Sequence, residues 1–130
     1  MSTDRISVMV TSGSREQLQM AAMVASVGAV SGSDVTVFVS MNAMKFFVKD
    51  SKESAPADGE MGKLLEDKNA PDFMELFGQA VEYGDAKIFP CSMAVDILEL
   101  KQDDLEGFVS EPLGLTAFLS DASEGQVWHF

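Results

Sequence analysis

The 130-residue chain has little cysteine, few basic residues and no long uninterrupted apolar run. Its single cysteine, Cys91, cannot form an internal disulfide, so the composition does not indicate a disulfide-stapled secreted scaffold. The charged residues Asp4 and Arg5 interrupt the N-terminus, and no apolar stretch approaches the length that spans a membrane. These absences predict a soluble cytoplasmic protein without a targeting segment or membrane anchor.

Basic residues number only nine against 21 acidic ones, which gives a formal net charge of −12. Nucleic-acid binding requires clustered lysine and arginine against the phosphate backbone, so this balance argues against a nucleic-acid partner. The negative charge would steer a basic partner toward the surface. A solvated acidic surface without a partner is the alternative interpretation, and the composition does not decide between them.

Metal and hydrolase chemistry are also poorly supported. One cysteine and one histidine, His129, fall short of the three or four ligands that zinc normally takes. No Gly-x-Ser-x-Gly sequence is present, which argues against a serine hydrolase with a nucleophile elbow. The nine methionines are typical of adaptable packing or of a subunit interface. No cofactor and no metal are predicted.

Hydrophobic residues make up 46% of the chain, enough for a real core in one domain spanning residues 1–130. Strand-like apolar runs alternate with segments of helical periodicity, and this alternation predicts an α/β fold with a mainly parallel sheet covered on both faces. Five strand segments are expected, at residues 6–10, 35–39, 86–89, 108–109 and 126–130. The main helices are expected at residues 15–30, 72–84, 92–100 and 112–122.

The helix expected at residues 15–30 is apolar nearly all round. Leucine and alanine form one side, whereas Met20, Met23, Val24 and Val27 occupy much of the other. A surface helix that covers a sheet normally keeps a polar face. We therefore expect one side of this helix to cover the sheet and the other to contact a second subunit, which predicts a homo-oligomer.

The segment of residues 49–69 is polar and long for a connection inside a compact domain. It contains Pro56, Gly59 and Gly62, and one helical turn is expected at residues 61–66. Segments of this kind are often lids or binding loops. A surface loop without a role is the alternative.

Cys91 stands where a short strand meets a helix. Pro90 favours an extended approach, and Ser92 is expected to cap the helix that follows. The N–H groups and dipole of a helix N-terminus favour the thiolate, so this position suits a nucleophile or a sulfur carrier. The alternative is a buried structural cysteine, because free cysteine is among the most buried residue types.

Several polar stretches follow strands of the predicted parallel sheet, at the edge where such sheets bind ligands. The candidates besides Cys91 are Ser12, Gly13, Ser14, Ser40, Met41, Asn42, Ser92, Met93 and His129. The topology allows them to converge on one pocket. Ser14 with Gln17 forms a capping-box pattern, which is a stronger interpretation than a phosphate loop.

Two basic side chains near that edge, His129 and Lys45, each have two possible roles. His129 is a candidate proton partner for Cys91, although a lone histidine near a chain end is more often a surface residue. Lys45 is a candidate for orienting an anionic group, or it is simply solvated.

Three stretches resemble the DsrE/DsrF-like family of small sulfur-relay proteins. The run from Cys91 to Asp96 resembles that family's cysteine-x-methionine-small-apolar-aspartate motif. The following turn at residues 101–105 and the strand motif at residues 37–43 are also similar, although many members have Asp-Gly where this chain has Asn42-Ala43. The resemblance covers most of the chain except residues 49–69, which vary in the family.

This resemblance implies a three-layer α/β/α sandwich with flavodoxin-like topology, assembled as trimers or hexamers. It implies that a cysteine at the position of Cys91 accepts sulfane sulfur as a persulfide and passes it to a partner, typically a TusA-like carrier. Some subfamilies act only as structural subunits, so a non-catalytic scaffold with a packed Cys91 is the alternative function. A peroxide-reducing thiol is a weaker third option, since it needs an external resolving partner.

Overall fold

The computed structural model describes residues 4–51 and 53–130; the predicted domain and the predicted loop also include residues 1–3 and 52, which lie outside the described residues. In the described part, four parallel strands form one sheet in the order β3-β2-β1-β4. They are β1 (Arg5–Val10), β2 (Asp34–Val39), β3 (Lys87–Pro90) and β4 (Gln126–His129). The predicted α/β fold with a parallel sheet is confirmed.

The two central strands carry most of the sheet's core. Val8 of β1 pairs with Val37 of β2, and Val10 pairs with Val39; all four valines are buried. Continuous apolar sequence on adjacent strands is typical of a parallel sheet covered on both faces, because side chains of both orientations are removed from water.

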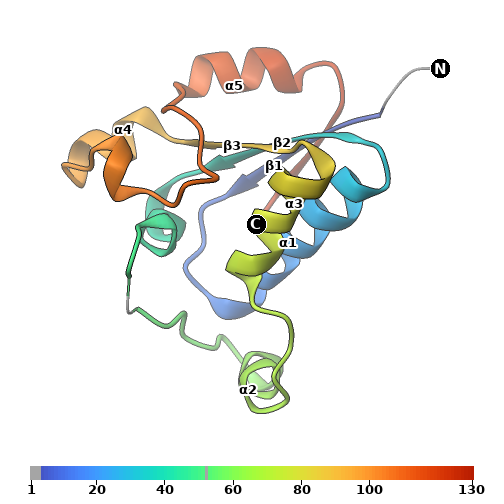
Figure 1. The fold of residues 1–130 in the computed structure, drawn as a ribbon, viewed down its shortest axis with the longest axis vertical. Helices are drawn as coiled ribbons and strands as arrows, with labels where there is room; N and C mark the ends of the chain where they lie inside the picture. Colours follow the sequence, from blue (N-terminus) through green and yellow to red (C-terminus); the bar gives the residue numbers. More distant parts are fainter. Residues whose placement is uncertain (1–3, 52) are drawn as a thin grey trace.

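Helices cover both faces of the sheet (Figure 1). On one face α1 (Arg15–Val30) lies beside α3 (Phe73–Gly84), and α5 (Leu115–Ala122) lies on the other. The rings of Phe38 and Phe118 stack with centroids 4.8 Å apart, which joins α5 to β2. The helices α1 and α3 approach closely where Gly84 meets Ala29; a Cβ at Gly84 would lie 2.6 Å from the Ala29 carbonyl carbon.

Four further helical segments complete the described part of the chain. They are the 3-10 helices η1 (Met41–Phe47) and η2 (Gln102–Asp104) and the α-helices α2 (Glu60–Asp67) and α4 (Ser92–Ile97). The helix α2 confirms the helical turn predicted at residues 61–66 and extends it at both ends.

The predicted fifth strand at residues 108–109 does not form as a strand. Val109 makes an isolated parallel bridge to Ile88, and the next bridge joins Leu113 to Cys91. From Ile88 to Cys91 the chain advances by three residues, whereas the segment facing it advances by four, from Val109 to Leu113. One extra residue therefore breaks the register between the two bridges. Pro112 lies in this stretch and has no N–H to donate, so the ladder cannot continue there.

The same stretch moves the start of the last helix. The sequence predicts this helix from residue 112, but α5 begins at Leu115. The Leu113 N–H donates to the Pro90 carbonyl oxygen at 2.9 Å, and this strand-like contact is incompatible with helix at that position.

The helix α1 is buried along one side and exposed along the other. Leucine and alanine are buried with Gln19 and Ser26, whereas Met20, Met23, Val27 and Val30 are exposed. The predicted two-sided character is therefore confirmed, and the subunit contact remains a prediction. Within residues 4–51 and 53–130, no helix combines the length and apolarity required to cross a bilayer.

Candidate functional site

The carboxyl ends of the strands bring the sequence candidates into one row. The Cys91 N–H donates to the Val39 carbonyl oxygen at 2.8 Å, so Cys91 lies beside Ser40. The Ser40 N–H donates in turn to the Val10 carbonyl oxygen at 3.0 Å, which continues the row to β1. The sheet order therefore decides which candidates are neighbours.

Cys91 occupies a closed position at the end of β3. The residue is 6% exposed. The segment of residues 110–114 lies along it: Leu113 bridges to Cys91, and the Leu113 carbonyl oxygen accepts the Ser92 N–H at 3.0 Å. The Cys91 carbonyl oxygen accepts the Val95 N–H, and Val95 is itself buried. The residue therefore has little contact with water, and the backbone of Leu113 lies beside it.

Cys91 itself, and not Ser92, is the capping residue of α4. Ser92 is the first helical residue, so the prediction that its side chain caps the helix is wrong. No side chain caps the first turn of this six-residue helix, which leaves its backbone donors at the Cys91 end without a side-chain acceptor. Ser92 is half-buried and Met93 is exposed beside it.

His129 lies at the opposite side of the sheet from Cys91. It ends β4, and its Nε2 atom is 3.0 Å from Thr11 Oγ1. Three strand spacings of about 4.8 Å separate β4 from β3, so the two strand ends are roughly 14 Å apart across the sheet. Within one chain the structure does not bring His129 to Cys91.

The ends of β1 and β2 open into a polar pocket of about 390 Å³. This pocket brings together four of the six predicted candidates at the ends of the two strands and part of the predicted loop; Ser40 and Met41 are not in its lining. Its lining consists of Ser12, Gly13, Ser14, Asn42, Lys45, Pro56, Ala57 and Asp58. The predicted convergence therefore occurs for these two strand ends, and Cys91 lies outside the pocket lining.

Hydrogen bonds hold the turn after β1. Ser14 Oγ accepts the Gln17 N–H at 3.3 Å, which caps α1 as predicted. The second half of the predicted capping box is absent among the described bonds, because the Ser14 N–H donates to Ser12 Oγ at 3.1 Å. The side chains of Ser12 and Ser14 therefore hold this turn, and the Ser12 N–H donates outside it, to the Phe130 carbonyl oxygen.

The turn after β2 is different, because it contains backbone strain. Ser40 is buried, whereas Met41 is exposed and has a φ of +53°. A methionine in this left-handed region is sterically unfavourable, and such residues tend to occur at functional turns.

The predicted loop is tethered to the start of α1. The Arg15 N–H donates to the Pro56 carbonyl oxygen at 2.9 Å, and the Glu16 carboxylate accepts the N–H groups of Asp58 and Gly59 at 2.8 and 2.6 Å. The Asp58 N–H is the main reason that the pKa of Glu16 lies below its ordinary value. Residues 56–59 thus form a fixed wall of the pocket.

Two parts of this site were not predicted from the sequence. Leu113, whose backbone pairs with Cys91, was assigned to a helix, and the only signal of its true position was the proline before it. The segment of residues 49–69 was interpreted as a lid or binding loop or as a loop without a role, and the sequence did not indicate that residues 56–58 line the pocket. Lys45 lines the pocket, and its Nζ atom is 3.1 Å from Glu53 Oε2.

Among residues 4–51 and 53–130, no group of three or more histidine, cysteine, aspartate or glutamate side chains is arranged to hold a metal ion.

The fold is similar to that of two solved structures. The YchN protein from E. coli has a TM-score of 0.65 at 15% identity, covering 99% of this chain and 100% of that one. The protein of unknown function MTH1491 from Methanobacterium thermoautotrophicum has a TM-score of 0.64 at 9% identity, covering 98% and 99% of the two chains. At these identities the likeness establishes the fold alone.

No curated protein matches the sequence. A sequence model of the DsrE/DsrF-like family, however, matches residues 4–127, nearly the whole chain. The match includes Cys91, the pocket at the ends of β1 and β2 and the loop that walls it. The chain belongs to the DsrE/DsrF-like family.

Proposed function

We propose that this protein is a sulfur carrier that holds sulfane sulfur as a persulfide on Cys91 and relays it to a partner protein. The observation that carries the proposal is the position of Cys91, at the carboxyl end of β3 and at the uncapped start of α4. Membership of a sulfur-relay-type family supports the same conclusion.

The reaction has two balanced steps. The Cys91 thiolate attacks the outer sulfur of a donor persulfide; the donor's S–S bond breaks, a new S–S bond forms on Cys91, and the donor leaves as a thiolate. The thiolate of an acceptor, such as a TusA-like carrier, then attacks the outer sulfur and regenerates the Cys91 thiolate. No net oxidation occurs, and the single cysteine requires that the acceptor thiol come from another molecule.

The closed position of Cys91 suits a carrier of a reactive intermediate. A persulfide exposed to water and small thiols would lose its sulfur before meeting the acceptor. Leu113 and its neighbours limit that access, and transfer requires this segment to move aside. We propose that the relay operates in the cytoplasm, where reducing conditions keep a lone thiol available.

Sulfur loading tests the proposal directly. The protein is incubated with a polysulfide or a persulfidated carrier, and its intact mass is measured. We expect the mass to increase by one sulfur atom in the wild type and in the neighbouring Ser92→Ala control, and not in Cys91→Ser. No gain in the wild type, or a gain that survives in Cys91→Ser, contradicts the proposal.

The burial of Cys91 favours a second candidate, an oligomeric scaffold in which the cysteine is only packed. Under this alternative, folded protein resists alkylation of Cys91 as strongly as it resists sulfur loading, and both reactions appear only on unfolding. Loading of the folded protein therefore separates the two functions.

We also propose that the protein assembles with copies of itself, as a trimer or hexamer, through α1 and β4. Their exposed sides form a mainly apolar groove of about 400 Å³, lined by residues that include Met23, Val27 and Trp128. Burying such a groove against a second copy removes apolar surface from water, which favours association.

Analytical ultracentrifugation tests this assembly. Val27→Glu places a charge on the groove and should dissociate the oligomer. Met61→Glu, a matched change at another exposed apolar residue on α2, should leave it intact. A wild-type monomer, or equal sedimentation of both variants, would remove the proposal.

A further inference from the structure

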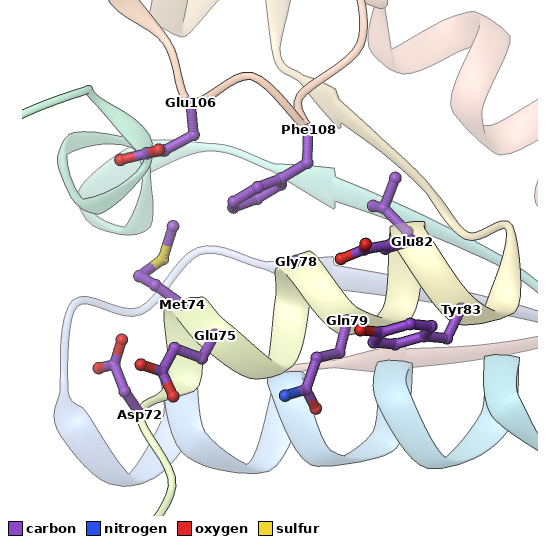
Figure 2. A pocket seen from close by; sticks show the side chains of 10 residues that line it. Asp72, Met74, Glu75, Gly78, Gln79, Glu82, Tyr83, Glu106 and Phe108 are labelled. Carbon is purple, nitrogen blue, oxygen red and sulfur yellow. The ribbon is translucent and has the colours of Figure 1, made fainter.

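A second hollow lies along α3, away from the strand ends (Figure 2). Its volume is about 520 Å³, and it runs between α3 and the segment that carries Glu106 and Phe108. Phe108 reaches down toward Gly78, where a Cβ would lie 3.5 Å from the ring. Met74 rises toward the same ring from the start of the helix. We call this hollow the α3 groove.

The α3 groove has a half-buried apolar floor and an acidic rim. The floor consists of Met74, Gly78, Val81 and Phe108. Carboxylates surround it: three lie along the helix and one stands across from it, namely Asp72, Glu75, Glu82 and Glu106. A surface that is apolar at its centre and charged at its edge is typical of a protein-binding site.

The rim charges are not neutralised within the described part of the chain. None of the four carboxylates takes part in an ion pair there, and the groove lining contains no lysine or arginine. They are also not arranged to hold a metal ion among the described residues. Their charge is therefore spread along the groove and complements several cations held apart, as on a peptide.

The charge also decides between classes of occupant. A second copy of this chain carries a formal net charge of −12, so an acidic groove repels it. Nucleic acids and anionic membranes are repelled for the same reason. We propose that the α3 groove docks a positively charged, amphipathic segment of another protein, with apolar side chains on the floor and lysine or arginine against the rim.

The dimensions agree with a short segment. From Asp72 to Tyr83 the helix rises about 17 Å, which matches about three turns of a bound helix. A further hollow shares Asp72, Met74 and Glu106 with the groove, so the groove opens into more space beyond the start of α3; the lining there is of mixed charge, with Asp50, Glu53 and Arg15.

Peptide binding tests the proposal. The probe is a fluorescent peptide of about twelve residues with lysine and leucine at helical spacing. Two comparison peptides replace either every lysine by glutamate or every leucine by serine. We expect the lysine–leucine peptide alone to bind the full-length protein, with an affinity that falls as salt is added.

Two triple variants with the same change in net charge locate the site. Glu75→Gln, Glu82→Gln and Glu106→Gln remove three of the four groove charges, whereas Asp96→Asn, Glu99→Gln and Glu124→Gln remove three exposed charges elsewhere. We expect the groove triple to weaken binding about tenfold and the control triple to leave it nearly unchanged. Phe108→Ala should weaken binding while the surface charge is unchanged.

Three results overturn the proposal: no binding of the lysine–leucine peptide, equal binding of the lysine–serine peptide, or equal weakening by both triples. Thermal unfolding of each variant confirms that it is folded before binding is compared. Cys91→Ser should bind the peptide as the wild type does, so docking is tested separately from sulfur transfer.

Discussion

The two halves of the sheet's carboxyl edge are built differently. At the end of β3, Cys91 is 6% exposed, and the backbone of Leu113 pairs alongside it. At the ends of β1 and β2, Ser12, Asn42 and Lys45 line an open polar pocket. Neighbouring strands of one sheet thus end in a closed apolar site and an open polar one.

The closed site and the open pocket differ because different segments follow the strands that end in them. After β1 the chain turns through half-buried polar residues, after β2 it continues through the exposed Met41 and Asn42, and residues 56–58 form only one wall over these two turns. After β3 a second segment lies against the strand end and takes up its hydrogen bonds. A closed site suits storage of a reactive sulfur, and an open one suits contact with small polar groups, so we assign storage to the Cys91 half alone.

Shortening Leu113, which pairs with Cys91, should have the largest effect, on the rate at which Cys91 is alkylated. Leu113→Ala removes most of the side chain beside the cysteine, and we expect Cys91 to be alkylated about tenfold faster in the folded protein, because local opening costs less free energy. The rate is measured with iodoacetamide by intact mass. Leu119→Ala, on the exposed side of α5, is the matched control. An unchanged rate in Leu113→Ala would mean that Leu113 does not limit access.

Adding a side chain at Gly13, in the polar pocket, should lower the stability of the protein without changing the alkylation rate of Cys91. A Cβ at Gly13 would lie 3.2 Å from Asn42 Cβ and 3.3 Å from its carbonyl oxygen, so the turn after β2 must give way. We expect Gly13→Ala to lower the free energy of unfolding by about 1 kcal/mol, measured by urea denaturation. Gly107→Ala, where a Cβ meets nothing within 4 Å, should change it less. A faster alkylation of Cys91 in Gly13→Ala would show that the halves are coupled.

The sequence predicted the order of elements well, because alternating strands and helices have strong periodic signals. It also placed Cys91 at a strand–helix junction, since Pro90 and the apolar run before it are local features. What it could not predict is which strand ends are neighbours. Sheet order is set by long-range pairing, and this order puts His129 three strands from Cys91.

The cover over Cys91 was missed for a related reason. Residues 112–113 have the composition of a helix start, with a proline where helices tolerate one. Pairing with β3 overrides this local preference, because the Leu113 backbone bonds to Pro90 and Ser92. The expected fifth strand fails at the same point, so one tertiary contact accounts for both differences.

The hydrogen bonds that tether Asp58 and Gly59 to the Glu16 carboxylate should weaken at low pH. Hydrogen bonds lower the pKa of Glu16 from its ordinary value of 4.5, so the stability that they contribute is present above that value and is lost as pH falls below it through the lowered pKa. We expect the amide NMR signals of Asp58 and Gly59 to shift together between about pH 5 and pH 2. In Glu16→Gln this titration should disappear. Signals that stay fixed in the wild type would contradict the tether.

The smallest effect is expected at Lys45. Its ion pair with Glu53 joins two side chains that are each about half exposed, so water and salt screen it. Lys45→Met keeps the apolar stem over Phe46 and should lower the free energy of unfolding by less than about 1 kcal/mol, with the difference shrinking at high salt. Lys45→Arg, which keeps the charge, should lie closer to the wild type. The alkylation rate of Cys91 should be the same in all three proteins, because the cation belongs to the open half of the edge. A change in that rate would mean that one site spans both halves, and that Lys45 helps to position the groups around the thiol.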